Sequence, residues 1–119
     1  MNSTNALLVA AIVAIESNGN NQARGRHGEI GALQVTKAVV ADVNRHHGTR
    51  YTVRRMTNRT EATDVFDRYM WIYATQSRLG RPVTDEDRAR IWNGGPNGWN
   101  RAATMPYLRR YRQQIGGAK

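Results

Sequence analysis

Apolar residues dominate the start of the chain and recur at helical spacing along most of the remainder. Ten consecutive apolar residues occupy 6–15, and Ser3 or Thr4 can cap a helix predicted over 4–17. Its broad apolar face consists of Leu7, Leu8, Ala11, Ile12 and Ile15. The stretch is shorter than the roughly 20 residues that a membrane span needs. It also lacks the preceding Lys or Arg that a signal peptide carries. We therefore expect a buried helix, with no membrane span and no evident signal peptide.

Further helices are predicted from caps, apolar stripes and glycines. Thr84 with the three acids after it is a strong helix start, and Gly48 and Gly80 each end a helical pattern. Residues 27–35 are punctuated by glycine and can form a small hairpin. The expected helices after the first cover 36–47, 60–79, 84–92 and 106–115. The chain of 119 residues thus predicts one domain, 1–119, with a mainly α fold of about five helices and at most a small β-hairpin.

The charge of the chain points to an anionic partner. Lys and Arg number 18 against 9 Asp and Glu, which gives a net charge of +9. Such a surface attracts nucleic acid, anionic membranes or an acidic cell wall. The absence of cysteine excludes disulfides, thiolate metal sites and a cysteine nucleophile. The three histidines have no carboxylate set at ligand spacing, so we expect no metal and no cofactor.

Glu16 is the first candidate for chemistry. It lies at the end of the apolar helix, beside a loop rich in glycine and amides. Burial against hydrophobic side chains disfavours the ionised carboxylate, so the pKa of Glu16 should rise. A carboxyl group with a raised pKa suits general acid catalysis of glycosidic bond cleavage. The alternative is a helix-end glutamate paired with one of the many arginines.

Two glycine-rich segments carry polar groups suited to sugars. In 28–35, Gln34 offers a neutral donor and acceptor for hydroxyl and acetamide groups. In 91–99, Trp92 can stack on a sugar ring and Asn93 can bind hydroxyls. The alternatives are a turn leading into a buried segment and a loop held by two core tryptophans.

The order of these segments resembles the lytic transglycosylase and goose-type lysozyme superfamily. That superfamily carries Glu-Ser, then Gly-Leu-Met-Gln, then Ala-Tyr-Asn-x-Gly, then Tyr-Val. Here Glu16 and Ser17 are followed by 31–35, by 92–96 and by Tyr107 with Leu108, so that the match spans about 7–112. The 93–98 run also looks like a loop of invertebrate-type lysozymes. The resemblance implies a lysozyme-like fold and, given the small size, a phage endolysin or virion-associated domain.

The resemblance also implies roles for individual residues. Glu16 matches the catalytic acid, and Gln34 and Asn93 match residues that bind the saccharide. Tyr107 matches the tyrosine that approaches the catalytic glutamate. Trp92 stands where the family has tyrosine, and an aspartate that goose-type enzymes carry is missing after Val35. Glu29 is the nearby candidate for a second catalytic carboxylate, and the alternative for it is a solvent-exposed loop acid.

Together these patterns predict a bacteriolytic, antimicrobial hydrolase of the cell wall. We expect a glycosidase that cleaves the β-1,4 bond between N-acetylmuramic acid and N-acetylglucosamine, a lysozyme (muramidase) with Glu16 as general acid. A lytic transglycosylase that forms 1,6-anhydro ends is the alternative. The expected partners are peptidoglycan glycan strands and anionic wall polymers, with no specific nucleic acid. We expect a monomer that is made in the cytoplasm and acts on the bacterial cell wall.

The sequence also fits a protein of another class. Runs of arginine at 54–55 and 109–112 would suit a small, basic, helical nucleic-acid-binding protein. Such a protein has no need of a part-buried Glu16 with Gln34 and Asn93 in the same chain. A wall-binding domain without catalytic activity is a third alternative.

Overall fold

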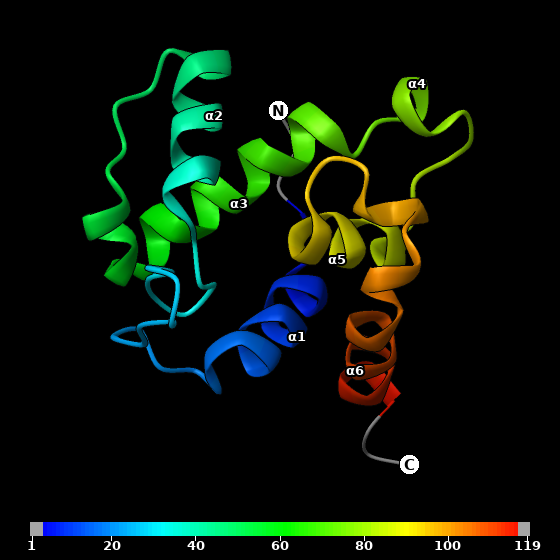
Figure 1. Ribbon diagram of the computed structural model, residues 1–119, viewed down its shortest axis with the longest axis horizontal. Helices are drawn as coiled ribbons and strands as arrows, with labels where there is room; N and C mark the ends of the chain where they lie inside the picture. Colours follow the sequence, from blue (N-terminus) through cyan, green and yellow to red (C-terminus); the bar gives the residue numbers. More distant parts are fainter. Residues whose placement is uncertain (1–3, 117–119) are drawn as a thin grey trace.

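The computed structural model describes residues 4–116, which form a mainly α fold (Figure 1). The mainly α class predicted from the sequence is confirmed. In these residues no strand forms, and the expected hairpin is reduced to two isolated antiparallel bridges, Arg24 with Ile30 and Ile30 with Val35. The helices are α1 (Ala6–Ser17), α2 (Lys37–His47), α3 (Arg59–Tyr73), α4 (Gln76–Leu79), α5 (Asp85–Gly94) and α6 (Met105–Gly116). Three 3-10 turns cover Val53–Thr57, Gly98–Asn100 and Ala102–Thr104.

Side-chain caps fix where most helices begin. Thr36 accepts a hydrogen bond from the Val39 amide at 3.1 Å, and Thr84 forms a reciprocal capping box with Asp87. Helix α1 is capped by Asn5, whose Oδ1 accepts from the Leu7 amide at 2.7 Å. The cap was expected at Ser3 or Thr4. Thr4 instead donates to the Asp67 carboxylate, and Ser3 lies outside the described residues.

The helix predicted over 60–79 is two helices. Helix α3 ends at Tyr73, and Thr75 takes extended backbone angles, φ −123° and ψ 148°. The Thr75 hydroxyl then caps α4 by accepting from the Arg78 amide at 3.2 Å. A threonine that bonds the backbone ahead of it starts a new helix instead of continuing the old one. The apolar stripe of the sequence does not show this competition.

The core lies where α1 meets α5 and α6 and where α3 crosses α2 (Figure 1). Leu8 and Ile12 of α1 and Phe66 of α3 are fully buried within it. Leu7, expected on the apolar face of α1, is instead 73% exposed. Helix α1 is apolar on almost every side, so its sequence pattern does not define the buried face. Within 4–116, no helix is long and apolar enough to cross a membrane.

Candidate functional site

Glu16 lies at the C-terminal end of α1, against the first turn of α6. The Tyr107 hydroxyl donates to Glu16 Oε2 at 2.8 Å, and the Tyr107 side chain is buried. The carboxyl group is half-buried between these two helices. In the part of the chain that the structure describes, no arginine lies within ion-pair distance of it. The arginine-paired alternative is therefore not what the structure shows.

The surroundings of Glu16 raise the pKa of its carboxyl group. Burial is the largest cause, because it penalises the charged form, and the negative charge of Glu29 adds to it. The Tyr107 hydrogen bond and the positive charge of Arg110 oppose the rise. Glu16 therefore holds its proton to a higher pH than an exposed glutamate.

Arg110 is a member of this site that the sequence analysis connected only with nucleic-acid binding. Its guanidinium lies over the Tyr107 ring, 5.5 Å from the centroid. Positions 107 and 110 are three apart on α6 and so share a helix face. That spacing was the available signal, because a residue three positions after Tyr107 lies beside it on the helix surface.

The 31–35 turn joins α1 to α5 and brings the candidate segments together. The Ser17 hydroxyl donates to the Ala32 carbonyl at 2.8 Å. From the other side, the Trp92 indole donates to the Leu33 carbonyl at 3.0 Å. Residues adjacent to Glu16 and Asn93 are thereby tied to one turn. Three segments that lie far apart in the sequence therefore meet at the end of α1.

Glycine makes the turn possible. Gly31 has φ +89°, a conformation that residues with a side chain rarely adopt. A Cβ on Gly31 would lie 1.9 Å from the Met56 carbonyl oxygen. The Gly31 amide donates to the Ala23 carbonyl at 2.8 Å, which fixes the turn to the preceding loop. The close approach of two backbone segments explains why this position needs glycine.

Gln34 is held within the same turn. It has φ +52°, and its Nε2 donates to the carbonyls of Gly31 at 3.0 Å and of Ala23 at 3.3 Å. A Cβ added to Gly25 would lie 2.6 Å from Gln34 Oε1 and 2.4 Å from Glu29 Oε1. Both oxygens therefore face Gly25. The Gln34 amide nitrogen therefore supports the turn, and its oxygen lies on the side of Glu29.

Glu29 has surroundings unlike those of Glu16. Its Oε1 accepts from the His27 amide at 2.7 Å. Hydrogen bonds from its own amide and from the His27 amide lower the pKa of the Glu29 carboxyl group. Glu29 therefore stays ionised at neutral pH, and it acts on Glu16 through its charge.

Trp92 and Asn93 differ in what they expose. Trp92 packs edge-on against Phe66, with ring centroids 4.8 Å apart, and against Tyr69 at 5.7 Å. Trp92 therefore holds the end of α5 to the core, in line with the alternative of a loop held by core tryptophans. The Asn93 side chain is exposed. Of the two, Asn93 is the group that a ligand in solution can reach.

The histidines do not gather into a metal site. His46 bonds the Asp42 carbonyl at 2.9 Å, and His47 Nδ1 lies 2.8 Å from Arg68. Over residues 4–116, no group of three or more His, Cys, Asp or Glu side chains could hold a metal ion.

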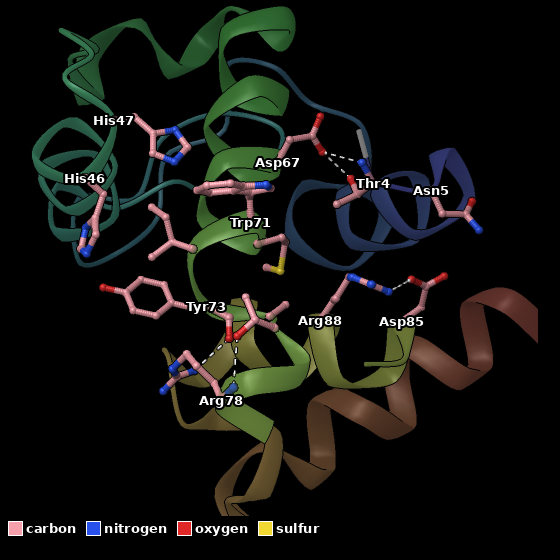
Figure 2. A pocket seen from close by; sticks show the side chains of 14 residues that line it. Thr4, Asn5, His46, His47, Asp67, Trp71, Tyr73, Arg78, Asp85 and Arg88 are labelled. Atoms are coloured by element: carbon pink, nitrogen blue, oxygen red, sulfur yellow. Dashed lines mark hydrogen bonds and ion pairs between the residues drawn. The ribbon is translucent and has the colours of Figure 1, made fainter. Parts of the chain in front are cut away.

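A large hollow of about 1170 Å³ lies elsewhere, at the N-terminal end of α1 (Figure 2). Thr4, Asn5, His47, Trp71 and Arg88 are among the residues that line it, and none of the predicted site residues does. Asn5 and Glu16 are separated by most of α1, roughly 16 Å along the helix axis. The hollow and the Glu16 site are therefore two separate regions.

Comparisons with known proteins give a likeness in fold. No family model and no curated protein matches the chain. A chain of the crystal structure of Aeromonas hydrophila PliI in complex with Meretrix lusoria lysozyme has a similar fold, with a TM-score of 0.79. The match is 24% identical and covers 98% of this chain and 95% of that chain. A likeness at this identity shows the fold, because one fold serves many functions.

The comparisons correct the family and the reaction expected from the sequence. No family model or curated protein supports the lytic transglycosylase and goose-type lysozyme superfamily, and the similar structure is that of PliI in complex with a lysozyme. The prediction that the chain belongs to that superfamily is therefore wrong. The predictions of a glycosidase, a muramidase or lytic transglycosylase, and an endolysin-type bacteriolytic hydrolase depended on that resemblance and are corrected with it.

Proposed function

We propose that the Glu16 site binds the glycan strands of peptidoglycan. The Glu16 site consists of Glu16, Tyr107, Asn93 and the 31–35 turn. The observation that carries the proposal is the meeting of these groups, which come from distant parts of the sequence. Ser17 and Trp92 each bond a carbonyl of the turn, and Tyr107 bonds Glu16 itself.

The polar groups of the site match those of amino sugars. A glycan strand presents hydroxyl and acetamide groups, which both donate and accept hydrogen bonds. A protonated carboxyl group and a neutral amide do the same. The raised pKa of Glu16 increases the protonated fraction of its carboxyl group. Asn93 adds an exposed amide next to Trp92, whose indole is bonded to the 31–35 turn.

The charge of the whole protein favours the same partner. The net charge of +9 attracts a cell wall whose stem peptides and associated polymers carry negative charge. This attraction raises the local concentration of glycan at the surface and weakens as the salt concentration rises. The bacterial cell wall is then the place where the protein acts.

Co-sedimentation with purified peptidoglycan tests the proposal. We expect Asn93→Ala to weaken binding roughly threefold to tenfold, the value of one or two lost hydrogen bonds. Asn100→Ala is the matched control, because Asn100 is also an exposed asparagine near the end of α5. Equal binding by wild type and Asn93→Ala would remove the support for this site.

Glu16→Gln tests the role of the proton. Glutamine keeps the neutral, hydrogen-bonding shape at every pH. Wild-type affinity should therefore rise as the pH falls through the pKa of Glu16, and the variant should bind equally at both ends of that range. The supernatants also report on chemistry. Soluble wall fragments released by wild type and not by Glu16→Gln would mean that the site cleaves the strands and that binding alone is too small a role.

The similar structure is a complex of two proteins, and this favours a second candidate function, the formation of a protein complex. That structure holds a lysozyme and PliI together, so the candidate is a complex of this chain with a lysozyme or with a PliI-like protein. Gel filtration of the chain with each partner measures the complex directly. A turbidity assay then shows whether an equimolar amount of this chain slows clearing by the added lysozyme. Unchanged elution with both partners rules this candidate out.

A further inference from the structure

We propose that the hollow beside Trp71, here called the Trp71 hollow, is a second glycan-binding site. It is bounded by the start of α1, the end of α2, the end of α3, α4 and the start of α5 (Figure 2). The proposal takes its ligand class from the proposed function. Its place and its residues are independent of the Glu16 site, since no residue of that site lines the hollow.

Trp71 presents an aromatic surface that the core does not use. The side chain is 58% exposed although its neighbours on α3, Asp67 and Met70, are buried. Its ring meets the His47 ring edge-on, with centroids 5.3 Å apart. Ligand pockets are typically lined by aromatic side chains together with a few polar groups. An indole face packs well against the apolar face of a sugar ring.

Polar groups in the wall surround this aromatic surface. His47 Nδ1 lies 2.8 Å from an Arg68 nitrogen, which can only donate, so the ring proton resides on Nε2. The pKa of His47 is lowered, first by burial and then by Arg68, which keeps the ring neutral. No described residue accepts a hydrogen bond from His47 Nε2, although the atom is buried. The Asp67 carboxylate accepts from the Thr4 amide at 3.1 Å, on the opposite side of Trp71 (Figure 2).

The charges that line the hollow cancel. Two arginines, Arg78 and Arg88, are matched by two aspartates, Asp67 and Asp85. Arg88 pairs with Asp85 at 2.7 Å. This balance is unusual on a chain of net charge +9. A site for a polyanion would collect unpaired cations here, whereas a balanced site suits a ligand that is polar and uncharged.

An exposed indole, donors and acceptors on both sides of it, and no net charge together fit a neutral amino-sugar oligomer. A strand of peptidoglycan repeats its sugars many times, so two separate sites on one protein can bind it together. The second contact then forms at a high effective concentration, and the affinity for the polymer exceeds that for a short oligomer. The Trp71 hollow thereby serves retention on the wall.

Titration with the N-acetylglucosamine tetramer, followed by NMR of the indole N–H signals, tests the site directly. The chain has three tryptophans, and Trp71→Ala identifies the signal of Trp71. We expect that signal to shift in wild type and to shift equally in Asn93→Ala. Retention on insoluble peptidoglycan should fall about tenfold in Trp71→Ala. Leu7→Ala is the control, because Leu7 is 73% exposed and lies outside the hollow.

The outcomes separate this proposal from the proposed function. A Trp71 shift that persists when Asn93→Ala has no effect on binding supports the hollow and removes the Glu16 site. The absence of a Trp71 shift overturns the hollow, whatever Asn93→Ala does. A larger shift with a short single-stranded oligothymidine than with the tetramer also overturns it, since the ligand would then be a nucleic acid.

Discussion

Two glutamates thirteen positions apart have opposite surroundings. Glu16 lies at the end of an apolar helix, where burial raises the pKa of its carboxyl group. Glu29 lies in the loop before the 31–35 turn, where backbone N–H groups lower the pKa of its carboxyl group. The same side chain is thus favoured in its neutral form in one region and in its charged form in the other. Two titratable groups with opposite tendencies in one place are typical of functional sites.

The two regions are also held by different forces. Apolar packing between α1 and α6 fixes Glu16, and the buried Tyr107 hydroxyl supplies its hydrogen bond. The loop around Glu29 is held by backbone hydrogen bonds and by a glycine in close contact with another segment. Loss of packing should therefore disturb the first region, and an added side chain should disturb the second. Substitutions can address each region separately.

Gly31→Ala should have the largest effect. The added methyl group would overlap the Met56 carbonyl oxygen, and alanine would be strained at the backbone angle φ of +89°. We expect the free energy of unfolding to fall by more than about 3 kcal/mol. Gly28→Ala is the matched control, since Gly28 has φ +86° with no atom within 4 Å. It should lose only about 1 kcal/mol. Equal losses in urea unfolding would show that backbone conformation, and not the Met56 contact, sets the requirement.

Much of the helix arrangement could be predicted from local chemistry. Thr36 and Thr84 cap helices as their hydroxyl groups and the acids after Thr84 suggest. The break after Tyr73 could not be predicted from the apolar stripe, because it depends on the Thr75 hydroxyl, which bonds the backbone ahead of it. The exposure of Leu7 could not be predicted either, since α1 is apolar on almost all sides.

Less of the candidate site could be predicted. The position of Glu16 after ten apolar residues indicated its burial and the direction of its pKa. The supporting role of Gln34 depends on its positive φ and on contacts within its turn, which no local pattern encodes. The Trp71 hollow was missed because it joins five separate helices, and its charge balance arises only when they fold together.

Tyr107→Phe should have an intermediate effect and isolates the bond that distinguishes Glu16. The variant loses the donor to Glu16 Oε2 and leaves no unpaired hydroxyl behind. We expect the free energy of unfolding to fall by about 1 kcal/mol at neutral pH, and the pKa of Glu16 to rise further because a lowering cause is gone. NMR titration of the Glu16 carboxyl carbon measures the second effect.

Tyr111→Phe is the control for that experiment. Tyr111 lies on the same helix and is buried to a similar degree, 4% exposed against 3% for Tyr107. It makes no side-chain hydrogen bond to residues 4–116. Its replacement should therefore change neither the stability by more than a few tenths of a kcal/mol nor the Glu16 titration. A Glu16 pKa that moves equally in both variants would mean that the Tyr107 bond is not its cause.

The smallest effects should come from Glu16→Gln and Glu29→Gln, and they should have opposite signs. The pKa of Glu16 is raised on folding, so its stabilising contribution is complete below the unfolded value of 4.5 and is lost as the pH rises through the folded pKa. The pKa of Glu29 is lowered, so its contribution is present above 4.5 and is lost as the pH falls through the folded pKa.

Urea unfolding at pH 7 and at pH 3 measures the direction of the stability change in both variants. Glutamine imitates the protonated acid, so Glu16→Gln should be more stable than wild type at pH 7 and equal to it at pH 3. Glu29→Gln should be less stable at pH 7, by at most about 0.5 kcal/mol because the carboxylate is near the surface, where water weakens electrostatic contributions, and that deficit should shrink as Glu29 protonates. Two variants that shift stability in the same direction at pH 7 would mean that the loop and the helix end present the same environment to a carboxyl group. The distinction between Glu16 and Glu29 would then disappear, because both carboxyl groups would favour the same protonation form.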